Sequence, residues 1–231
     1  MPAIGRNTGL QFLKGRYTAF LDHDDLWKPT KLGQVHRALQ QYPQAIAVSH
    51  DEQVLLNEEP GRRLHNFRKS DLPLYLELLI NGNFISTSAF VIRTDLLQES
   101  GGFRTERNLV TVEDYELWLR LAREGDFVHV PEVLGMYRVD GSGLSTNVTR
   151  LYRNLKNVID LHIENVREYG LQPARVYRQI DRRMRRDMAL DYLRQGLRGK
   201  SLLTLLGSVC RYAKPADCKL ALQILIGRAV V

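Results

Sequence analysis

Hydrophobic positions along the chain follow two patterns, and the change from one to the other lies near Thr146. Before this point, short apolar runs alternate with longer segments in which apolar residues recur every three or four positions. Such alternation predicts strands and helices in turn, as in a mostly parallel sheet covered by helices. After this point only the helical period continues. The sequence therefore predicts an α/β part followed by an α-helical part.

The predicted helices of the first part each have an apolar face and a glycine or proline near one end; they cover residues 6–13, 28–42, 72–80 and 113–124. In the second of these helices, Leu32, Val35 and Leu39 form the expected apolar stripe. The predicted strands are short apolar runs at residues 17–21, 45–49, 53–56, 84–92, 127–130 and 133–139. The second part is predicted to form helices at residues 148–170, 173–195, 201–212 and 215–227.

The order of the first elements is unusual for such a sheet. The chain opens on a predicted helix, and the buried strand at residues 17–21 follows it. A parallel strand in this position normally follows a partner strand across a right-handed crossover. We therefore expect that the first strand of the fold is missing from this chain.

Length, charge and hydropathy narrow the class of protein. The chain has 231 residues and a net charge of +7; residues 1–149 carry 16 Lys and Arg against 19 Asp and Glu, whereas residues 150–231 carry 17 against 7. No apolar run approaches the roughly 18–20 residues that span a bilayer, and the start lacks the apolar core of a signal peptide. Cys210 and Cys218 match no metal-binding or redox spacing. These features predict a cytoplasmic protein with two regions that have different tasks.

Three carboxylates, Asp22, Asp24 and Asp25, follow the apolar run at residues 17–21. Ligands of open α/β sheets bind at the carboxyl ends of strands. Carboxylate oxygens favour Mg²⁺ or Mn²⁺, and water and the phosphate oxygens of a substrate would complete the coordination shell of that metal. Asp25 is the first choice for the metal contact and Asp24 for a ribose hydroxyl. The alternative is an acidic loop that caps the next helix and faces solvent. An EF-hand is excluded because Trp27 stands where its loop requires glycine.

These residues belong to a longer segment, GRNTGLQFLKGRYTAFLDHDDLWKPTKL, that resembles the family 2 glycosyltransferases through their ARNxG helix, strand and DxD motif. Three later blocks of that family follow in the same order: NGNFISTSAFVIRTDLL with GGF, then TVEDYELWLRLAREG, then MYRVDGSGLS. The resemblance implies an incomplete GT-A (Rossmann-like) mixed sheet flanked by helices, in a domain over residues 1–145. A basic, α-helical C-terminal region would then occupy residues 146–231.

The resemblance also implies an activity. Family members are inverting enzymes that move a sugar from a nucleotide-diphosphate donor to an acceptor hydroxyl, here in the synthesis of cell-surface polysaccharide or glycolipid. By position, Asp24 and Asp25 match the acids for ribose and metal (Mg²⁺ or Mn²⁺). Asp114 matches the catalytic base, and Glu113 beside it is expected to bind substrate. A helix start favours a charged carboxylate, which suits a base. The alternative for Glu113 and Asp114 is N-terminal capping of their helix.

Two arginines complete the implied site. Arg6 resembles a residue near the nucleotide, although Gly5 replaces the usual alanine, and Arg138 matches a cation near the diphosphate. One departure from the family stands beside these matches. The opening strands that read the nucleotide base are absent before Met1, so the chain resembles the C-terminal part of such an enzyme.

The basic helical region lies outside the resemblance, and its densest basic run is residues 182–186. One interpretation is a solvated helix face. Another is attachment to the anionic inner face of a membrane, where a lipid-linked acceptor, as an alternative to a saccharide acceptor, would also lie. Nucleic-acid binding is not expected because no aromatic residues alternate with the arginines. The rival to an enzyme is a non-catalytic fragment or a membrane-surface module that uses this region.

Overall fold

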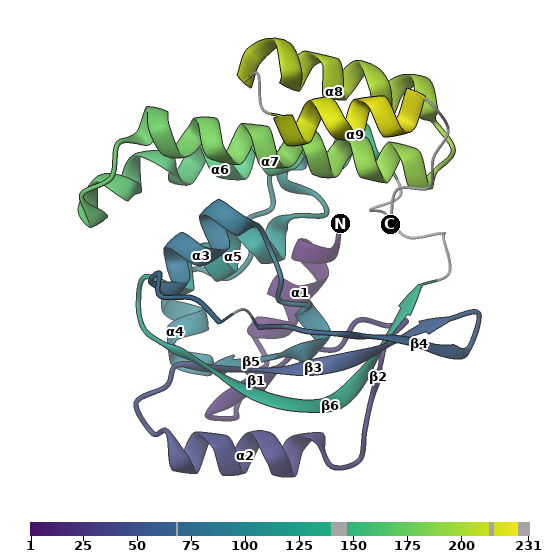
Figure 1. Cartoon of the computed structure of the whole chain (residues 1–231). Helices are drawn as coiled ribbons and strands as arrows, with labels where there is room; N and C mark the ends of the chain where they lie inside the picture. The colour runs from purple at the N-terminus through teal and green to yellow at the C-terminus, as the bar shows by residue number, and fades with distance from the viewer. Residues whose placement is uncertain (68, 140–146, 213–214, 226–231) are drawn as a thin grey trace. The chain divides into compact units, whose positions relative to one another are not determined.

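The computed structural model describes residues 1–67, 69–139, 147–212 and 215–225, and it divides the chain into two compact units, Met1–Thr146 and Asn147–Val231 (Figure 1). The predicted domain boundary between residues 145 and 146 lies outside the described residues, as does the end of the MYRVDGSGLS block.

The first unit contains one mixed sheet. Its strands are β1 (Tyr17–Ala19), β2 (Leu26–Trp27), β3 (Ala47–Leu56), β4 (Glu59–Leu64), β5 (Phe90–Arg93) and β6 (Phe127–Val139). They lie in the order β1-β5-β3-β6-β2, and β4 pairs with β3 at one side of this path. Only the pair β3–β6 is parallel among the described strands; the other pairs are antiparallel. The expected mixed sheet is confirmed, but a mostly parallel one is wrong, because a continuous apolar run indicates burial on both faces and not strand direction.

Helices cover both faces of this sheet (Figure 1). The helices are α1 (Pro2–Leu10), α2 (Lys31–Gln41), α3 (Leu74–Asn81), α4 (Thr94–Glu99) and α5 (Glu113–Leu121), with short 3₁₀ turns η1 (Thr87–Ala89) and η2 (Arg107–Leu109). Helix α2 lies alone on one face and packs Val35, Ala38 and Leu39 against strand residues such as Val48. On the other face Trp118 of α5 packs against Phe90, with ring centroids 3.9 Å apart. These two cores hold the strand ends in fixed positions.

Several predicted elements of this unit need correction. The first helix ends at Leu10 rather than residue 13, and Leu32, expected in the apolar stripe of α2, is 57% exposed. The two strands expected at 45–49 and 53–56 are the single strand β3, and those at 127–130 and 133–139 are the single strand β6. The strand expected at 84–92 is η1 followed by β5, and α4 was not expected.

Strand β4 was not predicted either, because its sequence EPGRRL lacks the alternation of a half-buried strand. It pairs with β3 through a turn in which Asn57 and Glu58 have φ angles of 51° and 66°. Asparagine adopts this conformation readily, but glutamate does not, so the turn has only half of its usual sequence signal.

The second unit is helical, as predicted. It contains α6 (Val148–His162), the 3₁₀ segment η4 (Ile163–Tyr169), α7 (Pro173–Arg194), α8 (Arg198–Tyr212) and α9 (Pro215–Leu225). Ala189 of α7, Leu205 of α8 and Ile224 of α9 share one apolar core. Beside this core, the buried carboxylate of Asp217 accepts hydrogen bonds from Arg182 and Ser208. Among the described helices, none has the length and apolarity that a bilayer crossing requires.

Candidate functional site

The chain leaves β1 and forms an acidic turn in which the three predicted carboxylates have different surroundings. Asp22 pairs with Arg6 at 2.6 Å, whereas the side chain of Asp24 is 45% exposed and points to solvent near His23. Asp25 is buried, and its Oδ1 accepts the backbone N–H of Arg138 at 3.0 Å. Burial raises the pKa of Asp25, although hydrogen bonds from Ser88 and from that backbone N–H act in the opposite direction. The three acids therefore differ in how freely they can meet a ligand.

Asp114, the predicted base, lies in the first turn of α5. Its Oδ2 accepts a hydrogen bond from Thr87 Oγ1 at 3.1 Å, and its Oδ1 accepts the backbone N–H of Tyr115 at 2.7 Å. Burial and the neighbouring charge of Glu113 raise the pKa of Asp114 to about 6, against the attraction of Arg6. A carboxyl with this pKa is deprotonated at neutral pH and is a stronger base than an exposed aspartate, as general base catalysis requires.

Arg6 of α1 connects α5 to the acidic turn. Its guanidinium lies 2.6 Å from Asp22 Oδ1 and 3.3 Å from Glu113 Oε1, and it stacks over the ring of Phe103 at 5.2 Å. The second oxygen of Glu113 is buried and has no hydrogen-bond partner among the described residues. The predicted residues Arg6, Glu113 and Asp114 thus lie together, and Asp22, for which no role was predicted, lies with them.

The short turn η1 lies between the acidic turn and the predicted base. Thr87 donates to Asp114, and the neighbouring Ser88 Oγ accepts the backbone N–H of Asp22 at 2.9 Å. The carbonyl oxygen of Ser88 accepts from Trp27 Nε1 at 3.0 Å. Two adjacent residues of one turn therefore determine the spacing between the acids that follow β1 and the acid that begins α5.

A buried lysine holds this turn from the other side. Lys31 is fully buried; its ammonium donates to the Ser88 carbonyl at 2.6 Å and lies 3.8 Å from the centre of the Trp27 ring. Burial lowers the pKa of Lys31 to about 7 and raises that of nearby Glu52 to about 7. Glu52 Oε1 and His50 Nε2 are buried without a partner among the described residues. No local sequence pattern identifies such a lysine, because its partners come from other elements.

Two backbone positions have a special geometry beside these groups. A Cβ atom on Gly135 would lie 3.3 Å from Glu52 Oε1, so the strand β6 approaches the buried acid closely at this point. Thr111, just before α5, has a φ of 78°, and its hydroxyl is buried without a partner in the described part of the chain. A β-branched residue with positive φ is strained, and such strain often accompanies functional sites.

Arg138, the predicted cation near a diphosphate, lies at the acidic turn. Its Nε donates to the carbonyl oxygen of Asp24 at 2.9 Å, and its guanidinium forms an ion pair with Glu58. It reaches the turn from the end of β6, so it comes from a different strand from the acids. The residues that follow it, 140–146, are outside the described residues.

The side chains at the acidic turn offer few ligands for a divalent cation. Among the described residues, no three His, Cys, Asp or Glu side chains gather in a way that could hold a metal ion. One exposed carboxylate, Asp24, remains available at the turn, whereas Oδ1 of Asp25 is already hydrogen-bonded. This set fits a hard cation only if the ligand supplies most of the oxygens.

Sequence comparison finds a family similar to the first part of the chain. Residues 1–101 match the family described as glycosyl transferase family 2. The putative teichuronic acid biosynthesis glycosyltransferase TuaG of Bacillus subtilis is 28% identical over 146 residues, which cover 63% of this chain and 55% of the relative. The UDP-Glc:alpha-D-GlcNAc-diphosphoundecaprenol beta-1,3-glucosyltransferase WfgD of Escherichia coli is 27% identical over 165 residues, covering 71% and 61%.

Comparison with solved structures confirms the fold class. The crystal structure of S. aureus TarS superimposes with a TM-score of 0.56 at 12% identity, covering 97% of this chain and 40% of that one. The complex of TarS 1–349 with UDP-GlcNAc gives a TM-score of 0.53 at 12% identity, covering 90% and 61%. The fold is that of GT-A glycosyltransferases. Residues 1–101 are similar to glycosyl transferase family 2, and the chain spans less than two thirds of the length of these relatives.

Proposed function

We propose that this chain carries the catalytic base and part of the donor site of a glycosyltransferase that moves a sugar from a nucleotide diphosphate to an acceptor hydroxyl with inversion. The observation that carries the proposal is the position of Asp114. Its pKa is raised to about 6, and it lies beside Arg6 and one turn away from the acidic segment that follows β1.

In the proposed reaction, deprotonated Asp114 takes the proton of the acceptor hydroxyl while the acceptor oxygen bonds to the anomeric carbon of the sugar. The bond from that carbon to the diphosphate breaks on the opposite side, and the nucleoside diphosphate leaves with the electron pair. Thr87 donates to Oδ2 of Asp114 and orients the carboxylate. Arg6 and Glu113 are proposed to position donor or acceptor groups beside it, because both reach the same space.

A bound Mg²⁺ or Mn²⁺ would neutralise charge on the leaving diphosphate. Asp24 suits the metal contact better than Asp25 because its side chain is 45% exposed, whereas Asp25 is buried and hydrogen-bonded to the backbone of Arg138. The proposal therefore ranks Asp24 first and Asp25 second, which reverses the order expected from the sequence. Mn²⁺ binding in the presence of a nucleoside diphosphate, measured by electron paramagnetic resonance, should be lost in Asp24→Asn.

The nature of the substrates is inferred from the relatives. TarS 1–349 was crystallised with UDP and with UDP-GlcNAc, which supports a nucleotide-sugar donor. The names of TuaG and WfgD support a role in polysaccharide synthesis, with a saccharide or a lipid-linked acceptor. A cytoplasmic location, with peripheral contact to the inner face of a membrane, is proposed on the same basis and on the basic second unit.

The decisive experiment replaces Asp114 by asparagine in the native protein. Removal of a general base should lower turnover by about 10²–10⁴-fold, while the dissociation constant of the donor changes little. The matched control is Asp95→Asn, an exposed carboxylate of α4 that pairs with Arg93 on the surface. Turnover that stays unchanged in Asp114→Asn would exclude this residue as the base.

A further inference from the structure

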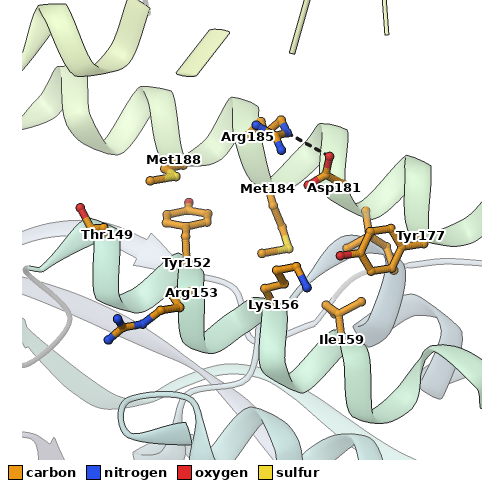
Figure 2. A pocket seen from close by; sticks show the side chains of 11 residues that line it. Thr149, Tyr152, Arg153, Lys156, Ile159, Tyr177, Asp181, Met184, Arg185 and Met188 are labelled. Atoms are coloured by element: carbon orange, nitrogen blue, oxygen red, sulfur yellow. Dashed lines mark hydrogen bonds and ion pairs between the residues drawn. The ribbon is translucent and has the colours of Figure 1, made fainter. Parts of the chain in front are cut away.

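A cavity of about 300 Å³ lies between α6 and α7 in the second unit (Figure 2). Its walls come from these two helices alone, between Thr149 and Met188, so none of the residues of the candidate glycosyl-transfer site lines it. A volume of this size is at the lower end of small-molecule sites. The cavity is therefore a second site whose ligand follows from its own lining.

The inner surface of the cavity is apolar. Ile159 and Ile180 form its base and are each only 1% exposed, and the side chains of Met184 and Met188 line it from α7. Methionine side chains adapt to ligands of irregular shape, and they are frequent on surfaces that accept varied apolar groups. This part of the cavity suits an alkyl chain.

The hydroxyl groups of Thr149 and Tyr152 in the lining are already occupied. The Thr149 hydroxyl bonds to that of Tyr192 at 2.7 Å, and Tyr152 donates to Asp191 at 3.0 Å. A ligand that must form hydrogen bonds inside the cavity, such as a sugar or a base, would find few free partners there. The lining therefore selects against polar ligands.

Two cations of α6 lie at the edge of the cavity. Arg153 and Lys156 are three residues apart and so project from the same side of the helix. Arg153 is exposed and has no ion pair among the described residues. Lys156 pairs with Asp160 at 2.6 Å, but both side chains are about half exposed, and such a pair contributes little to stability and exchanges easily. Both cations are available to an anion.

Asp181, an acidic residue of the cavity lining, repels a bound anion only weakly. Asp181 is held by Arg185 at 2.9 Å, and it also accepts from Tyr212 (Figure 2 shows the contact with Arg185). These partners hold the pKa of Asp181 below its usual range, so the charge is present but neutralised by Arg185 and the nearby Arg211. The region from residue 150 onward carries 17 Lys and Arg against 7 Asp and Glu, which adds a long-range attraction for anions.

We propose that this cavity binds an amphiphilic anion, with an alkyl chain between α6 and α7 and a phosphate head on Arg153 and Lys156. The ligand is a single alkyl phosphate molecule rather than a membrane surface, because the apolar part of the site is a recess between two helices and not a flat face. The proposal is independent of the glycosyl-transfer reaction.

The test is calorimetric titration of the 231-residue chain with decyl phosphate below its micelle concentration, with decanol and inorganic phosphate as separate titrations. Decyl phosphate should bind at least about tenfold more tightly than either of the other two. Equal affinity for inorganic phosphate would show that the cavity is not used, and equal affinity for decanol would show that the cations are not used. Either result would overturn the proposal.

Variants locate the binding. The double variant Arg153→Gln, Lys156→Gln should weaken decyl phosphate binding by about tenfold or more, and Met188→Trp, which fills the cavity, should weaken it further. Arg175→Gln is the matched control, because Arg175 is an exposed arginine of α7 outside the cavity lining. Far-UV circular dichroism confirms that each variant is folded. Wild-type affinity in both the double variant and Met188→Trp would refute the site.

Discussion

The two units of this chain treat charged side chains in opposite ways. In the first unit, several carboxylates are buried, and Asp25, Glu52 and Glu113 among them lie at the candidate site; the others are Asp51, Glu77 and Glu116. In the second unit, Asp217 is the one buried carboxylate among the described residues, and most ion pairs lie on the surface one helical turn apart, as in Lys156–Asp160. Burial of charge costs stability unless every group is paired. The first unit carries this cost, and at the candidate site burial raises the pKa values of Asp25 and Glu52, whereas the second unit leaves most of its charges exposed to solvent.

The most disruptive test of this comparison is Lys31→Ala. The substitution leaves the Ser88 carbonyl and the neighbouring acid Glu52 without their buried cation, and loss of one partner of a buried charged group costs about 3–5 kcal/mol. Urea unfolding followed by tryptophan fluorescence measures this, because Trp27 and Trp118 both lie in the first unit. The exposed Lys14→Ala should change the free energy of unfolding by under about 0.5 kcal/mol. A similarly small effect of Lys31→Ala would show that the ammonium does not hold the turn.

The buried carboxylate of the second unit, Asp217, gives the next largest expected effect. Arg182 pairs at 3.0 Å with Asp217, whose side chain is fully buried. Arg182→Ala should lower the free energy of unfolding of the helical unit by about 3 kcal/mol, since among the described residues Asp217 then keeps Ser208 as its one side-chain partner. Far-UV circular dichroism during urea unfolding is the measurement. Arg186→Ala, in the same basic run but exposed, is the control. If the two variants unfold alike, the buried pair has no special role.

A pH series sharpens the comparison within the first unit. The pKa of Glu52 is raised to about 7 from 4.5, so between these pH values the folded chain holds a proton that the unfolded chain has lost. Stability from this group is therefore present below pH 4.5 and is lost as pH rises to about 7. Glu52→Gln should remove about 3 kcal/mol of this loss. Unfolding at both ends of the range, with Glu59→Gln on the exposed strand β4 as control, measures it. An unchanged pH slope in Glu52→Gln would contradict the assignment.

The smallest effect is expected from a surface pair. Arg194 and Asp191 are three residues apart on α7 at 2.5 Å, with the arginine side chain 73% exposed. Arg194→Gln should change the free energy of unfolding by under about 0.5 kcal/mol, and the change should disappear in high salt. Parallel unfolding series at low and high salt check this result. A loss comparable with that of Arg182→Ala would remove the distinction between buried and surface charge.

The sequence predicted the helical unit well and the sheet only in part. Long helices such as α7 repeat their apolar period over six turns, and each repeat strengthens the prediction. The strands are shorter and buried on both faces, so their apolar runs carry no information on direction or register. The pairing of β1 with β5 joins residues up to 76 positions apart, as the register of Tyr17 opposite Arg93 shows, and it depends on the tertiary fold.

The residues of the candidate site likewise fall into those that could be predicted from the sequence and those that could not. Arg6, Asp24, Asp25, Glu113 and Asp114 stood in segments that resemble family motifs and could be named from that resemblance, although their roles stay predictions. The residues that support them could not be named from the sequence. Lys31 donates to the carbonyl oxygen of Ser88, 57 positions away, and Thr87 donates to an acid 27 positions away. Such contacts have no local pattern, because each polar partner is provided by the fold and not by its neighbours in sequence.

The left-handed conformation of Thr111 sets the stability of the backbone at this position against the rigidity of the segment before α5. Glycine would adopt its φ of 78° without strain and would remove the unpartnered hydroxyl. It would also give freedom to the segment that leads into α5, from which the proposed base projects. A search for thermostable variants would therefore select glycine at position 111, and a search for faster variants would reject it. At this position, selection for thermal stability and selection for turnover would favour different residues.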